Sequence, residues 1–181
     1  KYIYVRELDW DLGIDVDGLN ITFIPAIHWS SRIFFDRNET LWGSFIIKNV
    51  EKNKSIFFSC DTGLTNSVYQ RLGEKYGPVD LSIINIGAYD FYPMFEQDEV
   101  LFHTTPEQAV KIAELMGSKS MIGSHWGTFV LSLEYLEEPP ERFMKCKTEV
   151  KKILFKIGDI KKLDYKTDGL LDPFNNELLC F

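Results

Sequence analysis

Apolar and polar residues alternate in short blocks along the first third of the chain, a pattern typical of β-strands. Strands are predicted where β-branched and aromatic residues are dense. Clusters of Asp, Gly and Asn at positions 11–13, 15–18, 36–38 and 49–54 predict turns between them. The predicted strands are Tyr2–Leu8, Leu19–Ile24, Trp42–Ile47 and Ile56–Ser59.

The rest of the chain alternates strands with helices. The best-marked helix runs from about Pro106 to Met116, because Thr105 can cap it and Gln108 completes a capping box. A meander of strands followed by this alternation predicts an α/β sheet with helices on one face. The other predicted elements are a helix between Gly63 and Gly77, a helix from Glu141 to about Lys152, and strands at Leu81–Ile86, Lys119–Ser124 and Phe155–Ile160.

Size and charge exclude several classes of protein. The chain has 181 residues, of which 45% are hydrophobic, and this fits one ordinary domain. No apolar run approaches the roughly 20 residues that span a bilayer. A net charge of -7 argues against nucleic-acid binding, which needs a basic face. The three cysteines are far apart and indicate reduced thiols, so we expect an intracellular, cytoplasmic protein.

Three polar residues each stand directly after a predicted apolar strand and before turn-forming residues. They are His28, Asp61 and His125. If these strand ends meet at one edge of the sheet, imidazole nitrogens and a carboxylate suit Zn²⁺ or Fe²⁺, and a carboxylate can bridge two metal ions. Taken singly, a strand-end histidine is more often structural, and Asp-Thr-Gly is more often a turn. The pattern alone leaves both interpretations open.

A longer series of motifs resembles a known family. Its order along about Val5 to Pro140 is similar to the C-terminal half of the metallo-β-lactamase superfamily. Within that superfamily it most resembles the branch of N-acyl-phosphatidylethanolamine-hydrolysing phospholipase D and its bacterial relatives. The motifs are Pro25–Trp29 with Ser31-Arg32, Leu41–Ser44, Asp61–Gly63, Gly87–Tyr89, His103 with Pro106–Val110, and His125–Phe129.

The resemblance implies a β-sandwich flanked by helices, of which this chain is one half, with two zinc ions at one edge. It implies that His28 and His125 each ligate one zinc ion and that Asp61 bridges both. Asp61 and His103 would be catalytic, with His103 suited to substrate contact or proton transfer. Tyr89 and Trp126 would also line the substrate site. The implied reaction is hydrolysis of a phosphodiester lipid by a hydroxide held between the zinc ions.

The sequence also departs from the family. The remaining family ligands belong to a His-x-His-x-Asp-His motif, which is absent because all three histidines are already assigned. The chain begins with Lys1 rather than Met, so we expect it to be a single partial domain, with residues 141–181 as a C-terminal helix and tail. A missing N-terminal half or a homo-oligomer would then cover the sheet, and this chain alone would bind zinc weakly.

Two alternative functions remain open at this point. One is a truncated or degenerate module of the same fold that binds a partner without chemistry. The other is an aspartic protease built on Asp61-Thr62-Gly63, which would need a second such motif from a homodimer.

The loop before His103 is unusually apolar. It either faces lipid, because aromatic rings favour the membrane interface, or packs on its own core. Lysines between positions 145 and 166 could attract anionic lipid, but the acidic residues among them favour a solvated surface. We therefore expect a lipid or other small-molecule substrate and a peripheral membrane contact. The apolar residues are Phe91, Tyr92, Met94, Phe95, Leu101 and Phe102.

Overall fold

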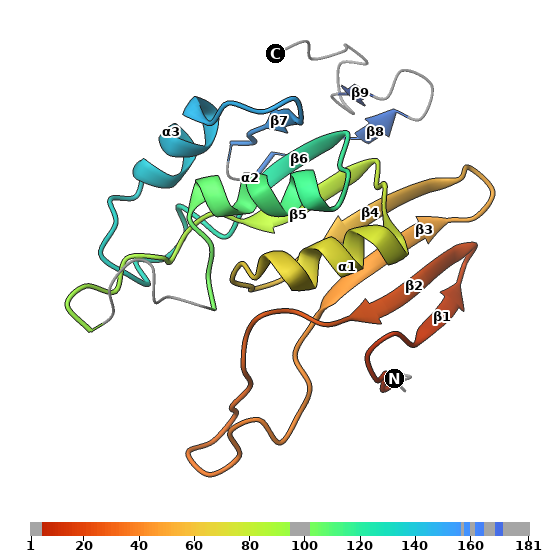
Figure 1. Ribbon diagram of the computed structural model, residues 1–181, viewed down its shortest axis with the longest axis horizontal. Helices are drawn as coiled ribbons and strands as arrows, with labels where there is room; N and C mark the ends of the chain where they lie inside the picture. The colour runs from red at the N-terminus through yellow and green to blue at the C-terminus, as the bar shows by residue number, and fades with distance from the viewer. Residues whose placement is uncertain (1–4, 95–101, 157, 160–161, 165–168, 172–181) are drawn as a thin grey trace.

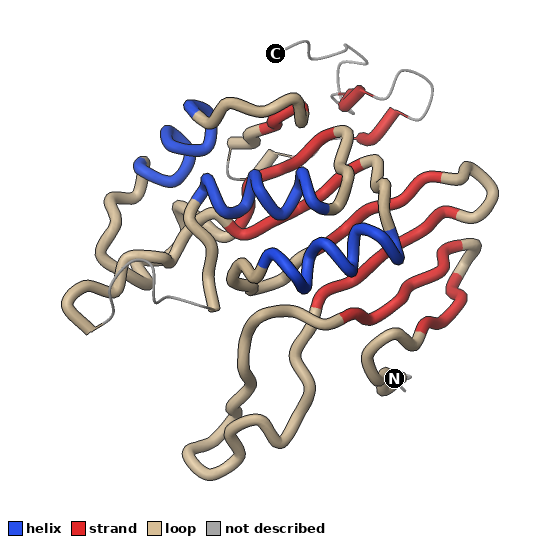
Figure 2. The backbone as a smooth tube through the Cα atoms, in the orientation of Figure 1, coloured by secondary structure: helices blue, strands red, loops and turns tan. Residues whose placement is uncertain are grey.

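One seven-stranded sheet organises the computed structural model, which describes residues 5–94, 102–156, 158–159, 162–164 and 169–171 (Figures 1 and 2). The strands lie in chain order, with β1 to β4 antiparallel and β4 to β7 parallel. A separate hairpin pairs β8 with β9. The strands are β1 Gly13–Val16, β2 Leu19–Ile24, β3 Ser44–Asn49, β4 Lys54–Phe58, β5 Leu81–Asn85, β6 Ser120–Ser124, β7 Lys151–Ile153, β8 Lys162–Asp164 and β9 Gly169–Leu171.

Helices cover one face of this sheet, which confirms the α/β fold expected from the sequence (Figure 1). They are α1 Asn66–Tyr76, α2 Pro106–Leu115 and α3 Glu138–Lys145. The core lies between the helices and the sheet. Its fully buried side chains include Phe57, Ile84 and Met121 from strands, with Tyr69 and Ile112 from helices. In the part of the chain that the structure describes, no helix is long and apolar enough to cross a membrane.

The other face of the sheet carries a second set of apolar side chains. Strand residues alternate between faces, so Phe23 and its partner Phe45 point away from the buried Ile46 and Phe57. Phe45 in turn pairs with Phe58 on β4. The side chains of this second set, unlike Ile46 and Phe57, are not fully buried. This is the face that we expected a missing half or a second copy to cover.

The capping box of α2 is confirmed, because the Thr105 side chain accepts from the Gln108 amide and the Gln108 side chain accepts from the Thr105 amide. The bounds of β2 are also those expected. The strand predicted at Trp42–Ile47 instead starts at Ser44. The pairing with β2 ends at Ile24 and Ser44, and the carbonyl oxygen of Trp42 accepts from the indole of Trp10 at 2.7 Å.

Predictions at the two ends of the chain were wrong. In Tyr2–Leu8 the described residues 5–8 form no strand, and the first strand is β1, whose Asp- and Gly-rich sequence resembles a turn. Residues 151–153 form β7 where a helix was predicted. The helix α3 begins earlier, at Glu138, because Pro139 and Pro140 suit a first turn that needs no amide donors. The described residues of Phe155–Ile160 lie outside any strand.

Candidate metal centre

The structure brings His28, Asp61, His103 and His125 together at one edge of the sheet. Strands β2, β4, β5 and β6 all point the same way, so their carboxyl ends meet at that edge. Ligand atoms of His28, Asp61 and His103 all lie within 4.8 Å of one another. His125 joins them, with its Nε2 atom 3.4 Å from Oδ1 of Asp61 and its ring centroid 5.1 Å from that of His103.

A backbone hydrogen bond fixes the tautomer of His28. Its Nδ1 atom donates to the carbonyl oxygen of Trp29 at 2.7 Å, so the neutral ring carries its lone pair on Nε2. The Trp29 indole also stacks on this ring at 5.5 Å between centroids. The Nε2 atom is buried and has no hydrogen-bond partner among the described residues. In metal-ligating histidines one ring nitrogen usually donates a hydrogen bond in this way, which leaves the other nitrogen available to bind the metal ion.

His103 presents a second nitrogen of the same kind. Its Nδ1 atom is buried without a hydrogen-bond partner in the described part of the chain. Burial, and to a smaller extent the neighbouring His125, lower the pKa of His103 to about 4. The ring is therefore neutral near pH 7. The next residue, Thr104, is fully buried and donates its hydroxyl to the carbonyl oxygen of Asn85, which fixes this segment to the end of β5.

Asp61 and His125 form a hydrogen-bonded pair. The hydrogen bond from His125 lowers the pKa of Asp61, although partial burial opposes the shift. The same bond raises the pKa of His125 against its own burial. Both strand ends also bend sharply, since φ is 52° at Cys60 and 60° at His125. This left-handed conformation is uncommon for residues other than glycine, and it often occurs at functional sites.

Thr62 ties the strand end that carries Asp61 to the one that carries His28. Its hydroxyl accepts from the amide of Ile27 at 2.9 Å, and the amide of Gly63 donates to the carbonyl of Ile27 at 2.8 Å. Thr62 is fully buried and also shares a hydrogen bond with the hydroxyl of Tyr69 in α1. The relative position of His28 and Asp61 therefore depends on this buried hydroxyl.

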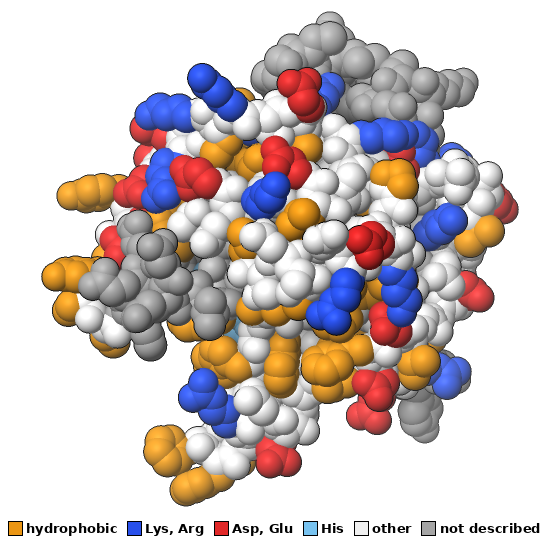
Figure 3. Space-filling model, in the orientation of Figure 1, with side chains coloured by type: hydrophobic (Ala, Val, Ile, Leu, Met, Phe, Trp, Pro, Cys, Tyr) orange, Lys and Arg blue, Asp and Glu red, His pale blue; other side chains and the backbone are white. Residues whose placement is uncertain are grey.

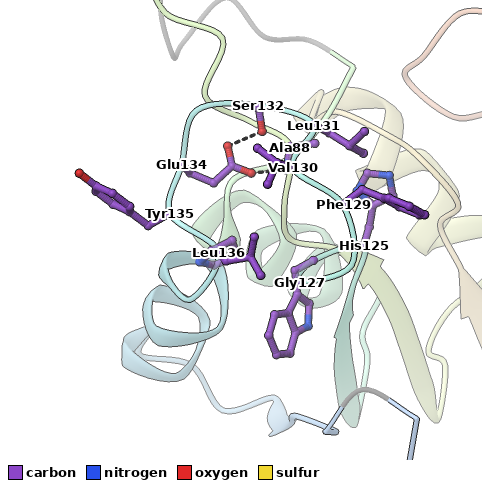
Figure 4. A pocket seen from close by; sticks show the side chains of 12 residues that line it. Ala88, His125, Gly127, Phe129, Val130, Leu131, Ser132, Glu134, Tyr135 and Leu136 are labelled. Atoms are coloured by element: carbon purple, nitrogen blue, oxygen red, sulfur yellow. Dashed lines mark hydrogen bonds between the residues drawn. The ribbon is translucent and has the colours of Figure 1, made fainter.

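Glu134 holds the loop that follows β5, and nothing in the sequence pattern indicated this role. Its carboxylate accepts from the amides of Ala88 at 2.6 Å and Asp90 at 3.1 Å, and from the hydroxyl of Ser132 (Figure 4). The loop bearing Glu134 follows His125 directly in sequence. Figure 4 shows that it curves over a pocket whose lining includes Ala88, His125, Phe129, Leu131, Glu134 and Leu136.

Tyr89 and Trp126, the two predicted substrate contacts, both lie beside this loop. Tyr89 is buried, donates its hydroxyl to Glu138 at 2.9 Å and packs its ring against the guanidinium of Arg142. Burial raises the pKa of Tyr89, and the hydrogen bond to Glu138 adds to the effect. Trp126 is half-buried, packs on the core and donates to the carbonyl of Gly123. Contact of either ring with a substrate stays a prediction.

The apolar loop before His103 divides into two kinds of residue. Phe102 packs edge-on against His28 at 6.1 Å, and Phe91 contacts both Phe102 and His103. Tyr92 and Met94 are exposed. Phe91 and Phe102 are thus packed within the protein, while contact of Tyr92 and Met94 with lipid stays a prediction. The predicted loop residues Phe95 and Leu101 lie outside the described residues.

Comparison with known proteins gives consistent matches. Residues 1–126 match a family described as beta-lactamase superfamily domain. An uncharacterized protein of Mycobacterium tuberculosis is 39% identical over 145 residues, which are 77% of this chain and 36% of that protein. The N-acyl-phosphatidylethanolamine-hydrolyzing phospholipase D, mitochondrial, of Saccharomyces cerevisiae is 35% identical over 143 residues, or 76% of this chain and 30% of the yeast protein.

A solved structure supports the same fold. Igni18 of the archaeon Ignicoccus hospitalis, described as a novel metallo hydrolase, superposes with a TM-score of 0.58 at 21% identity. The match covers 82% of this chain and 56% of Igni18. The chain spans about a third of the length of the mycobacterial and yeast relatives.

Proposed function

Because the chain belongs to the metallo-β-lactamase superfamily, we propose that it forms part of the active site of a metal-dependent hydrolase. Zinc is the proposed metal, and a phosphodiester lipid is the proposed substrate class. The observation that carries the proposal is the convergence of three histidines and one aspartate at one edge of the sheet. The substrate class is supported by the name of the yeast relative.

The residues of the cluster fit a divalent metal ion. His28 and His103 each have a buried imidazole nitrogen that lacks a hydrogen-bond partner among the described residues. Both histidines lie beside the carboxylate of Asp61. Leaving such polar atoms unsatisfied is costly, and a metal ion would satisfy both. Imidazole and carboxylate are the donors that zinc accepts in hydrolytic sites. A metal ion held there would act as a Lewis acid that withdraws charge from the oxygens of the substrate.

We propose that His28, Asp61 and His125 are ligands, with Asp61 placed between the two histidines. His103 lies in the same cluster, so its nitrogen either completes the ligand set or moves a proton to or from the substrate. The substitution His103→Gln separates these roles. Metal content falls if His103 is a ligand, and turnover falls at unchanged metal content if it transfers a proton.

Aromatic side chains pack against the histidine rings of this cluster. Trp29 stacks on His28, while Phe91 and Phe102 contact the histidine rings. We also propose that Tyr89 and Trp126 border the substrate.

We further propose that the apolar face bearing Phe23, Phe45 and Phe58 is covered by a missing N-terminal half or by a second copy of the chain. Such a large apolar surface favours association over exposure to water. The same additional residues would complete the metal site. We place the protein in the cytoplasm, with peripheral contact to a membrane.

The proposal is tested with the protein at its natural length. Hydrolysis of N-acyl-phosphatidylethanolamine in mixed micelles, and of bis(4-nitrophenyl) phosphate in solution, is measured before chelation, after it and after zinc is restored. We expect chelation to abolish turnover and zinc to restore it. Asp61→Asn and His125→Ala should each lower turnover by at least about 100-fold. The matched control Asp9→Asn changes an exposed aspartate and should leave turnover unchanged.

Unchanged turnover in Asp61→Asn would contradict the proposed role of this cluster. Full turnover in the chelated protein would contradict the role of the metal. Zinc binding without hydrolysis of either substrate would favour the non-catalytic module considered from the sequence.

A further inference from the structure

Two loops carry large apolar side chains into solvent. The loop between β2 and β3 exposes Ile33, Phe34 and Phe35 at its tip, and the two phenylalanine rings are 92% and 88% exposed. The loop after β6 exposes a second group, which consists of Phe129, Val130, Leu131, Leu133 and Tyr135. Scattered exposed apolar residues are normal, but groups of three to five on single loops are not.

Both loops start at the histidine cluster. The first leaves the sheet at His28, and the second leaves it at His125. Figure 1 shows that they extend from the same end of the molecule, the first downward and the second to the left. In Figure 3 hydrophobic side chains, drawn in orange, project at the left edge and at the bottom of the molecule. The candidate metal centre therefore lies between the points at which the two apolar loops leave the sheet.

Hydrogen bonds hold the turn at the apolar tip of the first loop. The carboxylate of Asp36 accepts from the amides of Arg32 at 2.8 Å and Ile33 at 2.9 Å, which closes the turn beneath the phenylalanines. These bonds lower the pKa of Asp36, so its carboxylate is charged near pH 7. Across the base of the loop, Ser30 donates its hydroxyl to the carbonyl of Thr40. The exposed rings thus belong to an ordered turn.

The second loop is held in a similar way. Glu134 binds the amides of Ala88 and Asp90, and the amide of Leu133 donates to the carbonyl of Asp90 at 2.8 Å. Figure 4 shows Glu134 directed toward Ala88 and Ser132, while Tyr135 points away from the pocket. The carboxylate of Glu134 therefore faces the protein. The apolar residues Phe129 and Leu131 border the pocket and are largely exposed to solvent, as is Leu133.

We propose that Phe34 and Phe35 on one loop, and Leu133 and Tyr135 on the other, dock the protein on a phospholipid bilayer on either side of the histidine cluster. This inference rests on the proposed function, because it brings the site to the surface where a lipid substrate resides. Aromatic and aliphatic side chains on ordered loops bind the bilayer interface through their buried apolar area.

The charged residues near the two loops favour binding to a neutral lipid surface over an anionic one. The guanidinium of Arg32 pairs with Asp36, and that of Arg37 lies over the Trp29 ring. Acidic residues Glu137 and Glu138 follow the second loop, and the chain as a whole has a net charge of -7. Anionic lipid would therefore add little attraction. We expect binding to phosphatidylcholine vesicles that changes little between low and high salt.

The test is flotation of the natural-length protein with phosphatidylcholine vesicles. Phe34→Ser/Phe35→Ser and Leu133→Ser/Tyr135→Ser should each lower vesicle partitioning by at least about tenfold, because each removes two apolar side chains from the contact. The matched control is Val50→Ser, which removes an exposed apolar side chain from the β3–β4 turn at the opposite end of the sheet. Its partitioning should equal that of the unsubstituted protein.

Two further measurements separate this inference from the proposed function. Turnover of bis(4-nitrophenyl) phosphate should be unchanged in Phe34→Ser/Phe35→Ser, and vesicle binding should be unchanged in Asp61→Asn. The inference is overturned if the unsubstituted protein does not float with vesicles or if the loop variants float equally well. It is also overturned if sedimentation shows that the loop variants convert a dimer to a monomer at unchanged partitioning, because the loops would then bind a second copy.

Discussion

The backbone of Gly87 lies directly against the backbone of His125. A Cβ atom added to Gly87 would stand 2.4 Å from the carbonyl oxygen of His125, closer than real Cβ contacts. The two residues follow neighbouring parallel strands, whose ends are joined by a hydrogen bond from the amide of Ile86 to the carbonyl of Ser124 at 2.9 Å. The position of the His125 imidazole therefore depends on a glycine at residue 87.

Gly87→Ala is expected to displace His125 and to destabilise the fold. The atom nearest to the new Cβ belongs to the backbone and cannot rotate away, so we expect a loss of about 1–3 kcal/mol in the free energy of unfolding. Metal affinity should fall at the same time. The measurements are urea unfolding and zinc titration of the natural-length protein.

Gly18→Ala is the control for that substitution. Gly18 has a φ of 79° at the β1–β2 turn, and no atom lies within 4 Å of an added Cβ. Its substitution should cost about 1 kcal/mol through backbone strain alone. Zinc affinity should not change. Equal zinc affinity in both variants would contradict the dependence of His125 on Gly87.

Thr62→Val is expected to separate the two strand ends that carry His28 and Asp61. The substitution keeps the shape of the side chain but removes the acceptor of the Ile27 amide and the partner of the Tyr69 hydroxyl. Leaving these groups unsatisfied should cost about 1–3 kcal/mol of stability. Zinc affinity should fall because Ile27 precedes His28.

Thr62→Ser keeps the hydroxyl and serves as the matched control. Thermal unfolding and zinc titration of both variants check the prediction. A loss of zinc affinity as large in Thr62→Ser as in Thr62→Val would show that packing of the methyl group, and not the hydrogen bond, holds the strand ends.

Asp80, at the other end of β5, provides a pH-dependent prediction. Burial alone would raise the pKa of Asp80, but hydrogen bonds from Lys119 at 2.8 Å, the Ser55 amide at 2.9 Å and Lys54 at 3.2 Å lower it below its usual value. A lowered folded-state pKa stabilises the protein above the unfolded-state pKa. That stability is lost as pH falls through the folded-state pKa.

Asp80→Asn should therefore destabilise the protein by about 1–2 kcal/mol at pH 7. The difference from the unsubstituted protein should shrink as the pH is lowered below about 4, the ordinary pKa of an aspartate, because the folded-state pKa of Asp80 lies below that value. Urea unfolding over this range checks the sign, with the exposed turn residue changed in Glu51→Gln as control. A difference that grows as pH falls would contradict the assignment.

Strong local signals made most of the fold predictable. The capping box at Thr105 and Gln108 fixed the start of α2, and the apolar run at 81–86 marked β5. The errors occurred where tertiary contacts override local pattern. The strand β1 has an Asp- and Gly-rich sequence and exists only through its pairing with β2. The short strand β7 forms through its pairing with β6.

The candidate site was predictable in part because strand ends are visible in the sequence. His28, Asp61 and His125 each follow an apolar strand, and parallel strands bring such ends to one edge. Glu134 and Thr62 could not be predicted, because their roles depend on amides distant in the sequence. Glu134 binds Ala88 across 46 positions, and Thr62 binds Ile27 across 35.

The central claim is that the histidine cluster holds a metal ion, and zinc content combined with X-ray absorption at the zinc edge tests it most directly. The measurement uses the natural-length protein, its His28→Ala and Asp61→Asn variants, and the surface control Glu51→Gln. We predict bound zinc with imidazole nitrogen in its coordination shell, and loss of zinc in both site variants only. A protein without bound zinc or another transition metal, or an unchanged zinc content and spectrum in His28→Ala, would contradict the claim.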